Sequence, residues 1–212
     1  MKKLSKETLE NYDYNKYAHN KRHSKQAEKK FWKYVFDENG FVGDPTPSTQ
    51  NEFWVGNKCH ILSGIIERRP ELSGIGLEGN AIDKEAFEFL ADNTNVEWSL
   101  SLSTNTGNGF LYTSHIKNEL YPEESLQKGY NIYSHSHGNT IYGTGEKEKV
   151  INAYNLPSES DLYLLKSGKI AEYNYSGFYI YNKANKDKKY HEWNKNTESM
   201  EDYAERNRLN IE

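Results

Sequence analysis

The sequence predicts an α/β domain of the layered α+β kind, in which helices flank a mixed central β-sheet. The first observation is a strand over 96–103, where apolar and polar side chains alternate with a period of two. The second is the order of the expected elements: helix, three strands, helix, two strands. The apolar members of the strand are Val96, Trp98, Leu100 and Leu102, and the polar ones Glu97, Ser99, Ser101 and Ser103. Small side chains beside Glu97 leave room for a functional site on that face.

The other elements are placed by helical or alternating spacing and by turn residues. A basic amphipathic helix is expected over 24–35, and a linker rich in proline, threonine and serine over 43–51. A second helix is expected to be capped by Asn80, and a third to cover 158–166. Further strands are expected over 59–66, 109–115 and 130–135, followed by a hairpin of 170–175 and 178–182.

Length and composition fit one core with appended segments, because the chain has 212 residues. The mean hydropathy of -0.99 comes with no apolar run of the roughly 18 residues that a membrane span needs. The first residues also lack the apolar segment of a secretory signal peptide. We therefore expect a cytoplasmic location in the producing cell, with any export through a specialised secretion system. Cys59 is the only cysteine, so any metal site must use histidine and carboxylate ligands.

Charge is distributed unevenly along the chain, although the net charge is only -4. We divide the chain into a basic N-terminal helical segment and linker (1–50), a central domain (51–195) and an acidic C-terminal tail (196–212). The basic segment allows nucleic-acid binding as one hypothesis, but it lacks a recognised motif and the whole chain is acidic. We interpret it as an appended helix or a docking segment. Its densest part is 16–33, where Glu28 is the only acidic residue and the positive residues are Lys16, Lys21, Arg22, Lys25, Lys29, Lys30 and Lys33.

Two histidines separated by one residue, His135 and His137, lie at the end of the aromatic strand over 130–135. Residues two apart on a strand point to the same side, so both imidazoles can face one ion. A catalytic zinc site commonly has three protein ligands and one open position. Asp161, in the first turn of a helix, can supply the third ligand.

Each of these features also has an ordinary explanation when it stands alone. Two close histidines in a polar segment are often surface residues. A serine followed three residues later by an acid, as in Ser158 and Asp161, is a common helix N-terminus. Glu97 can be a solvated carboxylate on a strand face.

The order of these features resembles the JAMM (MPN+) zinc metallopeptidases. Glu97 begins a strand, His135-Ser136-His137 ends a later strand, and Ser158 to Asp161 opens a helix. The likeness is greatest to the JAB-like domains of bacterial polymorphic toxins and secreted effectors, and it covers about half of the chain. It implies a JAMM/MPN-like fold, with a layering like that of cytidine deaminases and with the N-terminal helix appended.

The resemblance also implies a function, which is zinc-dependent hydrolysis of a peptide or isopeptide bond. It assigns Zn²⁺ to three ligands and two catalytic roles to further residues, a general base and an oxyanion donor. The implied partners are a protein or peptide substrate, together with an immunity protein or a component of a secretion apparatus. The implied ligands are His135, His137 and Asp161, the general base is Glu97, and the oxyanion donor is Ser158.

Some alternatives remain open at this point. A catalytically inactive MPN-like scaffold that binds another protein would share the fold. The stretch 138–157 is longer than the family's usual spacing, and we expect it to be a flap that shapes substrate access. Cys59 is expected to be a small buried hydrophobe. The other histidines are expected to be structural or surface residues, namely His19, His23, His60, His115 and His191.

Overall fold

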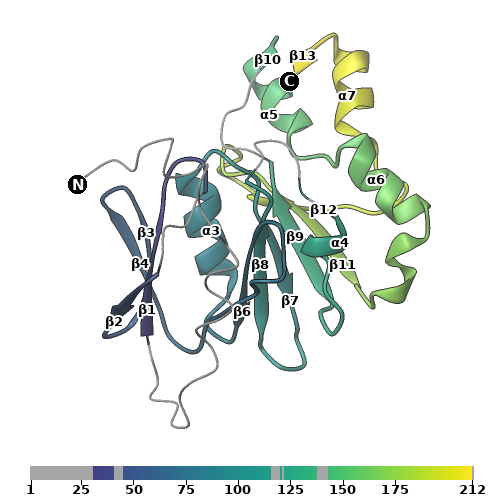
Figure 1. The fold of residues 1–212 in the computed structure, drawn as a ribbon. Coiled ribbons are helices and arrows are strands. Elements are labelled where there is room, and N and C mark those ends of the chain that lie inside the picture. The colour runs from purple at the N-terminus through teal and green to yellow at the C-terminus, as the bar shows by residue number, and fades with distance from the viewer. Residues whose placement is uncertain (1–30, 41–44, 116–119, 121, 138–142, 212) are drawn as a thin grey trace.

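The computed structural model describes residues 31–40, 45–115, 120, 122–137 and 143–211. In this part of the chain a seven-stranded sheet is the largest element (Figure 1). It is mixed, because β9 and β11 run parallel while the other neighbouring strands are antiparallel. In spatial order its strands are β12 (Tyr190–Glu192), β11 (Gly177–Tyr181), β9 (Ile132–Ser136), β7 (Ser99–Leu102), β8 (Gly109–Thr113), β6 (Ile75–Gly79) and β5 (Glu67–Arg68). The mixed sheet and the flanking helices that the sequence predicts are therefore confirmed.

Two smaller sheets accompany it. The four-stranded sheet has the order β2 (Thr46–Ser48), β1 (Phe31–Phe36), β3 (Asn51–Val55) and β4 (Lys58–Leu62). The two-stranded sheet pairs β10 (Gly143–Thr144) with β13 (Asn210–Ile211). The helices are α3 (Lys84–Asn93), α4 (Pro122–Ser125), α5 (Lys147–Ala153), α6 (Glu159–Lys166) and α7 (Met200–Asn207), with the 3-10 helix η2 at Lys169–Glu172.

Helix α3 fills the space between the four-stranded sheet and one face of the large sheet (Figure 1). The apolar side chains of β7 face this layer, where Trp98 and Leu100 pack with Phe87 of α3 in the main core. Phe36 of β1 meets Trp98 edge to face, at 5.6 Å between ring centroids. Burial of these aromatic rings supplies much of the apolar contact that holds the two sheets together.

The other face of the large sheet is covered by α4, α6 and η2. Leu126 and Ile170 pack on Tyr133 of β9, and Leu162 of α6 packs on Ile180 of β11. The polar face of β7 is therefore buried rather than open. Ser99 and Ser101 are fully buried, and the Ser101 hydroxyl lies 2.7 Å from the hydroxyl of Tyr175. Tyr175 thus fills part of the room that the small side chains leave.

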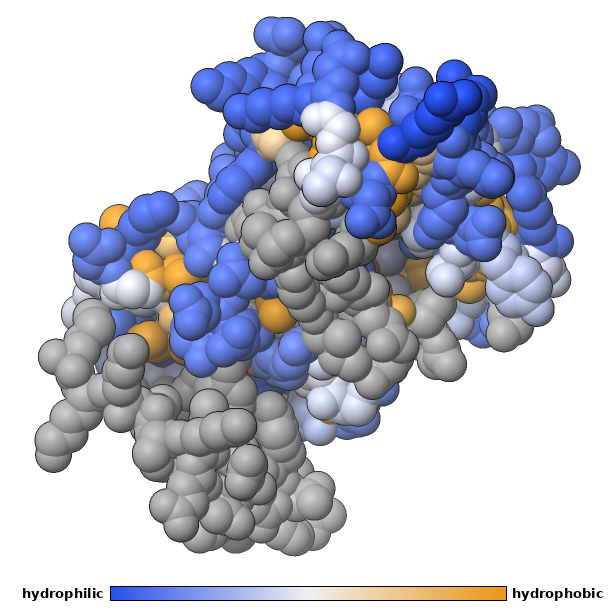
Figure 2. Space-filling view, turned by 90° about the horizontal axis from the view of Figure 1, so that it is seen from above, coloured by the Kyte–Doolittle hydropathy of each residue, from blue (hydrophilic) through white to orange (hydrophobic). Residues whose placement is uncertain are grey.

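The outer surface agrees with the low mean hydropathy. On the face seen from above, Figure 2 shows mainly hydrophilic residues, with hydrophobic ones in small patches between them. No helix in the described part of the chain is long and apolar enough to cross a membrane.

The expected helix over 24–35 is wrong where the structure describes it, because residues 31–36 form β1. Tyr34 and Phe36 alternate toward the core and meet Phe53, and β1 runs parallel to β3. The helix was expected from the spacing of four apolar residues, Ala27, Phe31, Trp32 and Val35. This spacing did not outweigh the pairing of aromatic strands. The rest of the basic segment lies outside the described residues. Within the expected linker, Thr46–Ser48 form β2 against β1.

The expected C-terminal hairpin is also wrong. The segment 170–175 is not a strand: Gly168, with φ of 74°, precedes η2, whose Ile170 is buried. β11 pairs instead with β9 and β12, so the expected hairpin is absent from the described fold. The acidic tail contains α7, which Ser199 caps and which packs on α5. Its strand β13 pairs with β10, although the division of the chain into domains itself stays a prediction.

The remaining expected elements are present, and they differ from the prediction only in where they begin and end. The helix after Asn80 is α3, but its N-cap is Asp83, whose side chain accepts a hydrogen bond from the Ala86 amide. Asn80 instead accepts a hydrogen bond from the amide of Ile65. Strands β4, β7, β8 and β9 fall within or beside their expected ranges, and α6 follows its expected cap Ser158.

Candidate metal centre

Strand β9 places His135 and His137 on the same side of the large sheet. His135 lies directly opposite Ser99 of β7, which fixes the side to which its ring points. Ser136, between the histidines, faces the other side, where its hydroxyl accepts a hydrogen bond from the amide of Trp98. The two imidazole centroids are 5.2 Å apart. The predicted shared orientation of the two histidines is therefore present.

Helix α6 brings the third group. Asp161 lies in its first turn, and Ser158 and Asp161 form a reciprocal capping box. The Asp161 carboxylate accepts hydrogen bonds from the Ser158 amide at 2.9 Å and from the Ser158 hydroxyl at 2.7 Å. The capping box is thus the device that fixes the Asp161 side chain as it faces β9.

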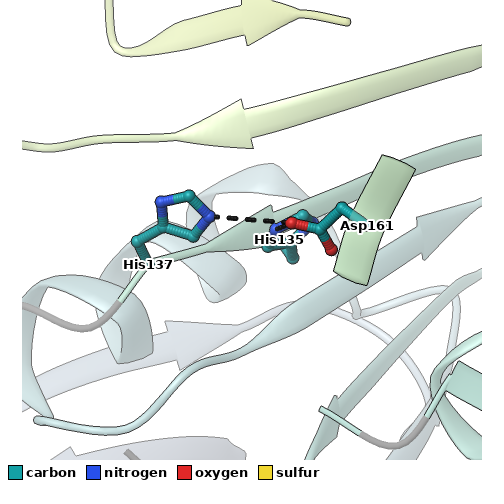
Figure 3. A group of neighbouring side chains, drawn as sticks. All are labelled: His135, His137 and Asp161. Atoms are coloured by element: carbon teal, nitrogen blue, oxygen red, sulfur yellow. Dashed lines mark ion pairs between the residues drawn. The ribbon is translucent and has the colours of Figure 1, made fainter. Parts of the chain in front are cut away.

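The carboxylate of Asp161 faces both imidazoles (Figure 3). One of its oxygens, Oδ2, lies 3.3 Å from Nε2 of His135 and 4.0 Å from Nε2 of His137. One ligand atom from each of the three residues lies within 4.8 Å of the others. The side chains of His135 and His137 are only 3% and 8% exposed, and that of Asp161 is 23% exposed. The site is therefore nearly closed, with Asp161 as its most accessible member.

The electrostatics favour the protonation states that a metal ligand needs. Burial lowers the pKa of His137, and the nearby Asp161 carboxylate only partly opposes this shift. Burial alone would raise the pKa of Asp161, but the charges and hydrogen bonds of His135 and His137 outweigh it and hold that pKa well below its usual value. An ionised carboxylate beside a neutral imidazole is a ligand pair ready to bind a cation.

These residues fit a bound metal ion by the chemistry of their donor atoms. Two imidazole nitrogens and a carboxylate oxygen form a donor set that zinc commonly uses. Nε2 of His135 faces the Asp161 carboxylate, whereas its Nδ1 is buried and has no hydrogen-bond partner among the described residues. Burying two histidines and an aspartate together is costly without a partner, and a cation is the partner that suits all three.

Glu97 lies on the same face of the sheet as the histidines. It precedes β7 by two residues, and pairing of the two strands continues through Trp98, whose carbonyl accepts a hydrogen bond from the Ser136 amide. Glu97 is 9% exposed. Burial raises the pKa of Tyr133, and the carboxylates of Asp161 and Glu97 both add to this rise, so both lie within electrostatic reach of that hydroxyl. Glu97 is not one of the three clustered ligands.

Ser158 is placed beside Asp161, but its hydroxyl is engaged there. It donates to the Asp161 carboxylate and accepts from the Asp161 amide at 3.2 Å. The structure thus brings four of the five predicted site residues into direct or shared contact, with Glu97 two residues before the adjoining strand β7. Their catalytic and metal-binding roles remain predictions.

The same helix-start pattern occurs a second time, at Ser199 and Asp202 of α7. There the Ser199 hydroxyl accepts from the Asp202 amide at 3.0 Å, while Asp202 itself is exposed. Since no histidine is clustered with Asp202 among the described residues, this second pair shows the pattern in its ordinary capping role. Only tertiary packing distinguishes the two.

An open hollow runs along α6, lined by residues that include Glu159, Tyr163, Lys166 and Tyr173. The first three are spaced four and three residues apart, so they share one face of the helix. Asp161 lies nearly opposite that face. The hollow is therefore separate from the clustered histidines and carboxylate.

The expected flap, 138–157, is described only from residue 143 onward, where it forms β10 and α5. Tyr154, at the end of α5, has its ring centroid 6.1 Å from that of His137. Residues 138–142, which would join it to β9, lie outside the described part of the chain. Its role in substrate access stays a prediction.

The remaining candidate residues have structural or surface positions where the structure describes them. His60 stacks on Phe89 with 5.5 Å between ring centroids, and His191 lies on the short edge strand β12. His115 is half-buried, with φ of 65°, after the end of β8. Cys59 is exposed, so its expected burial is wrong: it lies on the outward side of β4, opposite Trp54.

One neighbour of the site was missed from the sequence. The indole of Trp193 packs against His135, with 6.2 Å between ring centroids and an angle of 85° between the rings. It follows β12, far along the chain from either histidine. A single aromatic residue in a polar segment gave no signal of this position.

The mixed sheet, its flanking helices and the clustered histidines and aspartate are consistent with a JAB-like domain. Residues 78–166 match the model of the family described as JAB-like toxin 1. The resemblance found in the sequence is therefore confirmed for this segment, which is similar to a JAB-like toxin domain. The matched segment contains Glu97, both histidines, Ser158 and Asp161. No significant match was found among curated proteins or solved structures.

Proposed function

We propose that this protein is a zinc-dependent metallopeptidase or isopeptidase that hydrolyses an amide bond in a protein or peptide substrate, as a bacterial toxin or effector domain. The observation that carries the proposal is the convergence of His135, His137 and Asp161, whose ligand atoms lie within 4.8 Å of one another. The family match to a JAB-like toxin supports the toxin role. We also propose that the fold is JAMM/MPN-like, with a layering similar to that of cytidine deaminases.

The three clustered residues would hold Zn²⁺ and leave a position for water, as in catalytic zinc sites. When bound, the ion supplies Lewis acidity and lowers the pKa of that water to near neutrality. The protein's own contribution is a set of ligands held before binding: β9 fixes both histidines, and the capping box fixes Asp161. Such fixed ligands lose little conformational freedom when they bind.

Glu97 would act as the general base. It lies on the face of the sheet that carries His135, outside the group of clustered ligands, and is almost completely buried. A carboxylate in such a position can accept the proton of the attacking water and then deliver it to the leaving amine. Glu97 would thus act first as the base that activates the water and then as the acid that protonates the leaving amine.

Ser158 would donate a hydrogen bond to the oxyanion that develops on the substrate carbonyl. In the structure its hydroxyl donates to Asp161 at 2.7 Å. Rotation of the Ser158 side chain would release this proton for the oxyanion, while the Ser158 amide would still hold Asp161.

A toxin role carries expectations about partners and location. We propose that the producing cell protects itself with an immunity protein that binds this domain, and that a specialised secretion system exports it. A substrate protein or peptide is the third partner. These assignments rest on the toxin description of the family.

Metal analysis and a cleavage screen test the proposal. The purified protein should contain about one zinc per chain, and His137→Ala should lose it. A proteomic screen should find peptide ends that the wild type generates and Glu97→Gln does not. A folded wild type that binds no zinc would instead support the inactive scaffold, and zinc binding without any cleavage would leave only a metal-binding domain.

A further inference from the structure

A tryptophan from outside the family match packs on the proposed metal ligand His135. Trp193 is only 3% exposed and belongs to a small cluster with Leu162 of α6 and Ile180 of β11. Its ring meets the His135 ring at 85°, with 6.2 Å between centroids, which is an edge-to-face contact. It also touches Phe178, at 5.3 Å between ring centroids.

The backbone holds this tryptophan firmly. The Trp193 amide donates a hydrogen bond to the Phe178 carbonyl at 3.0 Å, which extends the pairing of β12 with β11 by one residue. Phe178 in turn pairs with Tyr133 of β9, two residues before His135. Trp193 and His135 therefore lie on the same face of the sheet, and the position of the indole is set by the sheet itself.

Within the described part of the chain, the His135 ring makes no hydrogen bond through Nδ1. A histidine that binds a metal usually donates its second ring nitrogen to a carboxylate, a carbonyl or water, and that bond fixes the plane of the ring. Here Nδ1 of His135 is buried without a partner among the described residues. The rings that contact His135 are those of Tyr133, His137 and Trp193.

The indole N–H of Trp193 is also buried and has no partner in the described part of the chain. An unpaired buried donor is a cost that phenylalanine at this position would avoid. What the indole does supply is a large rigid surface against His135 and Leu162. The contact that matters is therefore the packing of the ring, rather than a hydrogen bond from it.

We infer that Trp193 is a positioning residue of the proposed metal centre: it fixes the plane of the His135 imidazole by edge-to-face packing, in the place of the usual hydrogen bond. The inference rests on the proposed function, since it concerns a ligand of the metal. It adds a residue from beyond the matched segment 78–166 to the site. The segment after β11 would therefore contribute to the zinc affinity of the site.

Two substitutions at this position separate packing from hydrogen bonding. Trp193→Leu removes the aromatic contact, so His135 must be ordered when the metal binds, and zinc affinity should fall roughly 3-fold to 10-fold. Trp193→Phe keeps an aromatic ring and removes only the unpaired N–H, so its zinc affinity should stay within about 3-fold of wild type. The absorption spectrum of the Co²⁺-loaded protein should change in the leucine variant and be restored in the phenylalanine variant.

Phe87→Leu is the matched control. Phe87 is fully buried on the opposite face of the sheet, where it packs on Tyr181 and has no contact with His135. It should lower the stability of the protein but leave zinc affinity unchanged. Zinc affinity is measured by competition with a chromophoric chelator, on variants shown to be folded by circular dichroism and urea denaturation.

The outcomes are distinguishable. If the wild type binds no zinc, the proposed function fails and this inference fails with it. If the wild type binds zinc and Trp193→Leu binds it equally well, only the positioning role is overturned. Equal losses of zinc affinity in Trp193→Leu and Phe87→Leu would show a general effect of stability and would also overturn it.

Discussion

Asp161→Asn separates the proposed metal-binding role of Asp161 from its role in capping α6. Asparagine keeps the length of the side chain and an acceptor oxygen, so the hydrogen bonds from Ser158 can persist, but it removes the charge that faces His135 and His137. The zinc affinity and the stability of the protein should therefore respond by different amounts.

The expected loss of zinc affinity follows from the contribution of one ligand to the free energy of zinc binding. Binding energies of about 10–16 kcal/mol for four-ligand zinc sites correspond to about 2.5–4 kcal/mol for each ligand. Loss of such a ligand should weaken zinc binding roughly 10²-fold to 10³-fold. The metal-free protein should lose about 1–3 kcal/mol of unfolding free energy, since two buried imidazoles lose a charged partner.

The second helix cap supplies the control. Asp202→Asn changes the same position of the same pattern in α7, where the carboxylate is exposed. It should cost no more than about 1 kcal/mol, through the helix dipole, and should not affect zinc binding. Chelator competition and urea denaturation of the metal-free proteins measure both quantities. If Asp161→Asn and Asp202→Asn bind zinc as tightly as wild type, Asp161 is a helix cap and no ligand.

Further predictions concern the proposed base, the proposed oxyanion donor, the metal and the half-buried Tyr175. Glu97→Gln should keep its zinc but slow cleavage roughly 10²-fold to 10⁴-fold, as measured on a substrate from the screen; unchanged turnover would remove Glu97 from the mechanism. Ser158→Ala should lose about 0.5–2 kcal/mol of stability with the cap and roughly 10²-fold to 10³-fold in kcat, so a variant that loses stability alone would mark Ser158 as a cap. A strong chelator should abolish cleavage and added Zn²⁺ should restore it; activity that persists in metal-free protein would contradict the zinc mechanism. Tyr175→Phe, which removes contacts with Ser101 and Gln127, should cost about 1 kcal/mol in urea denaturation without a change in zinc affinity, and a lower zinc affinity would instead connect Tyr175 to the site.

Much of the fold around the site could be predicted from local patterns. Strict alternation identified β7, and an N-cap serine followed by an acid identified α6, because both signals depend only on neighbouring residues. The expected helix over 24–35 and the expected hairpin at 170–182 failed, because partners distant in sequence decided them. Phe31–Phe36 pairs with β3, and Gly177–Tyr181 pairs with β9.

The sequence alone determined which chemical groups are present and in what order: a carboxylate before β7, two histidines sharing one side of β9, and an acid in the first turn of α6. Strand and helix periodicity suffices for this, since it fixes the direction of each side chain relative to its own element. The sequence also carries the family resemblance, which the match over 78–166 confirms.

Only the tertiary structure decided which of these groups meet. Asp161 and Asp202 follow serines at the same spacing, yet only Asp161 lies 3.3 Å from His135. Trp193 reaches the same histidine from beyond β12, and the serines of β7 are buried beneath other side chains. Distances between elements depend on how the helices pack on the sheet, and that packing is set by contacts between residues far apart in the chain.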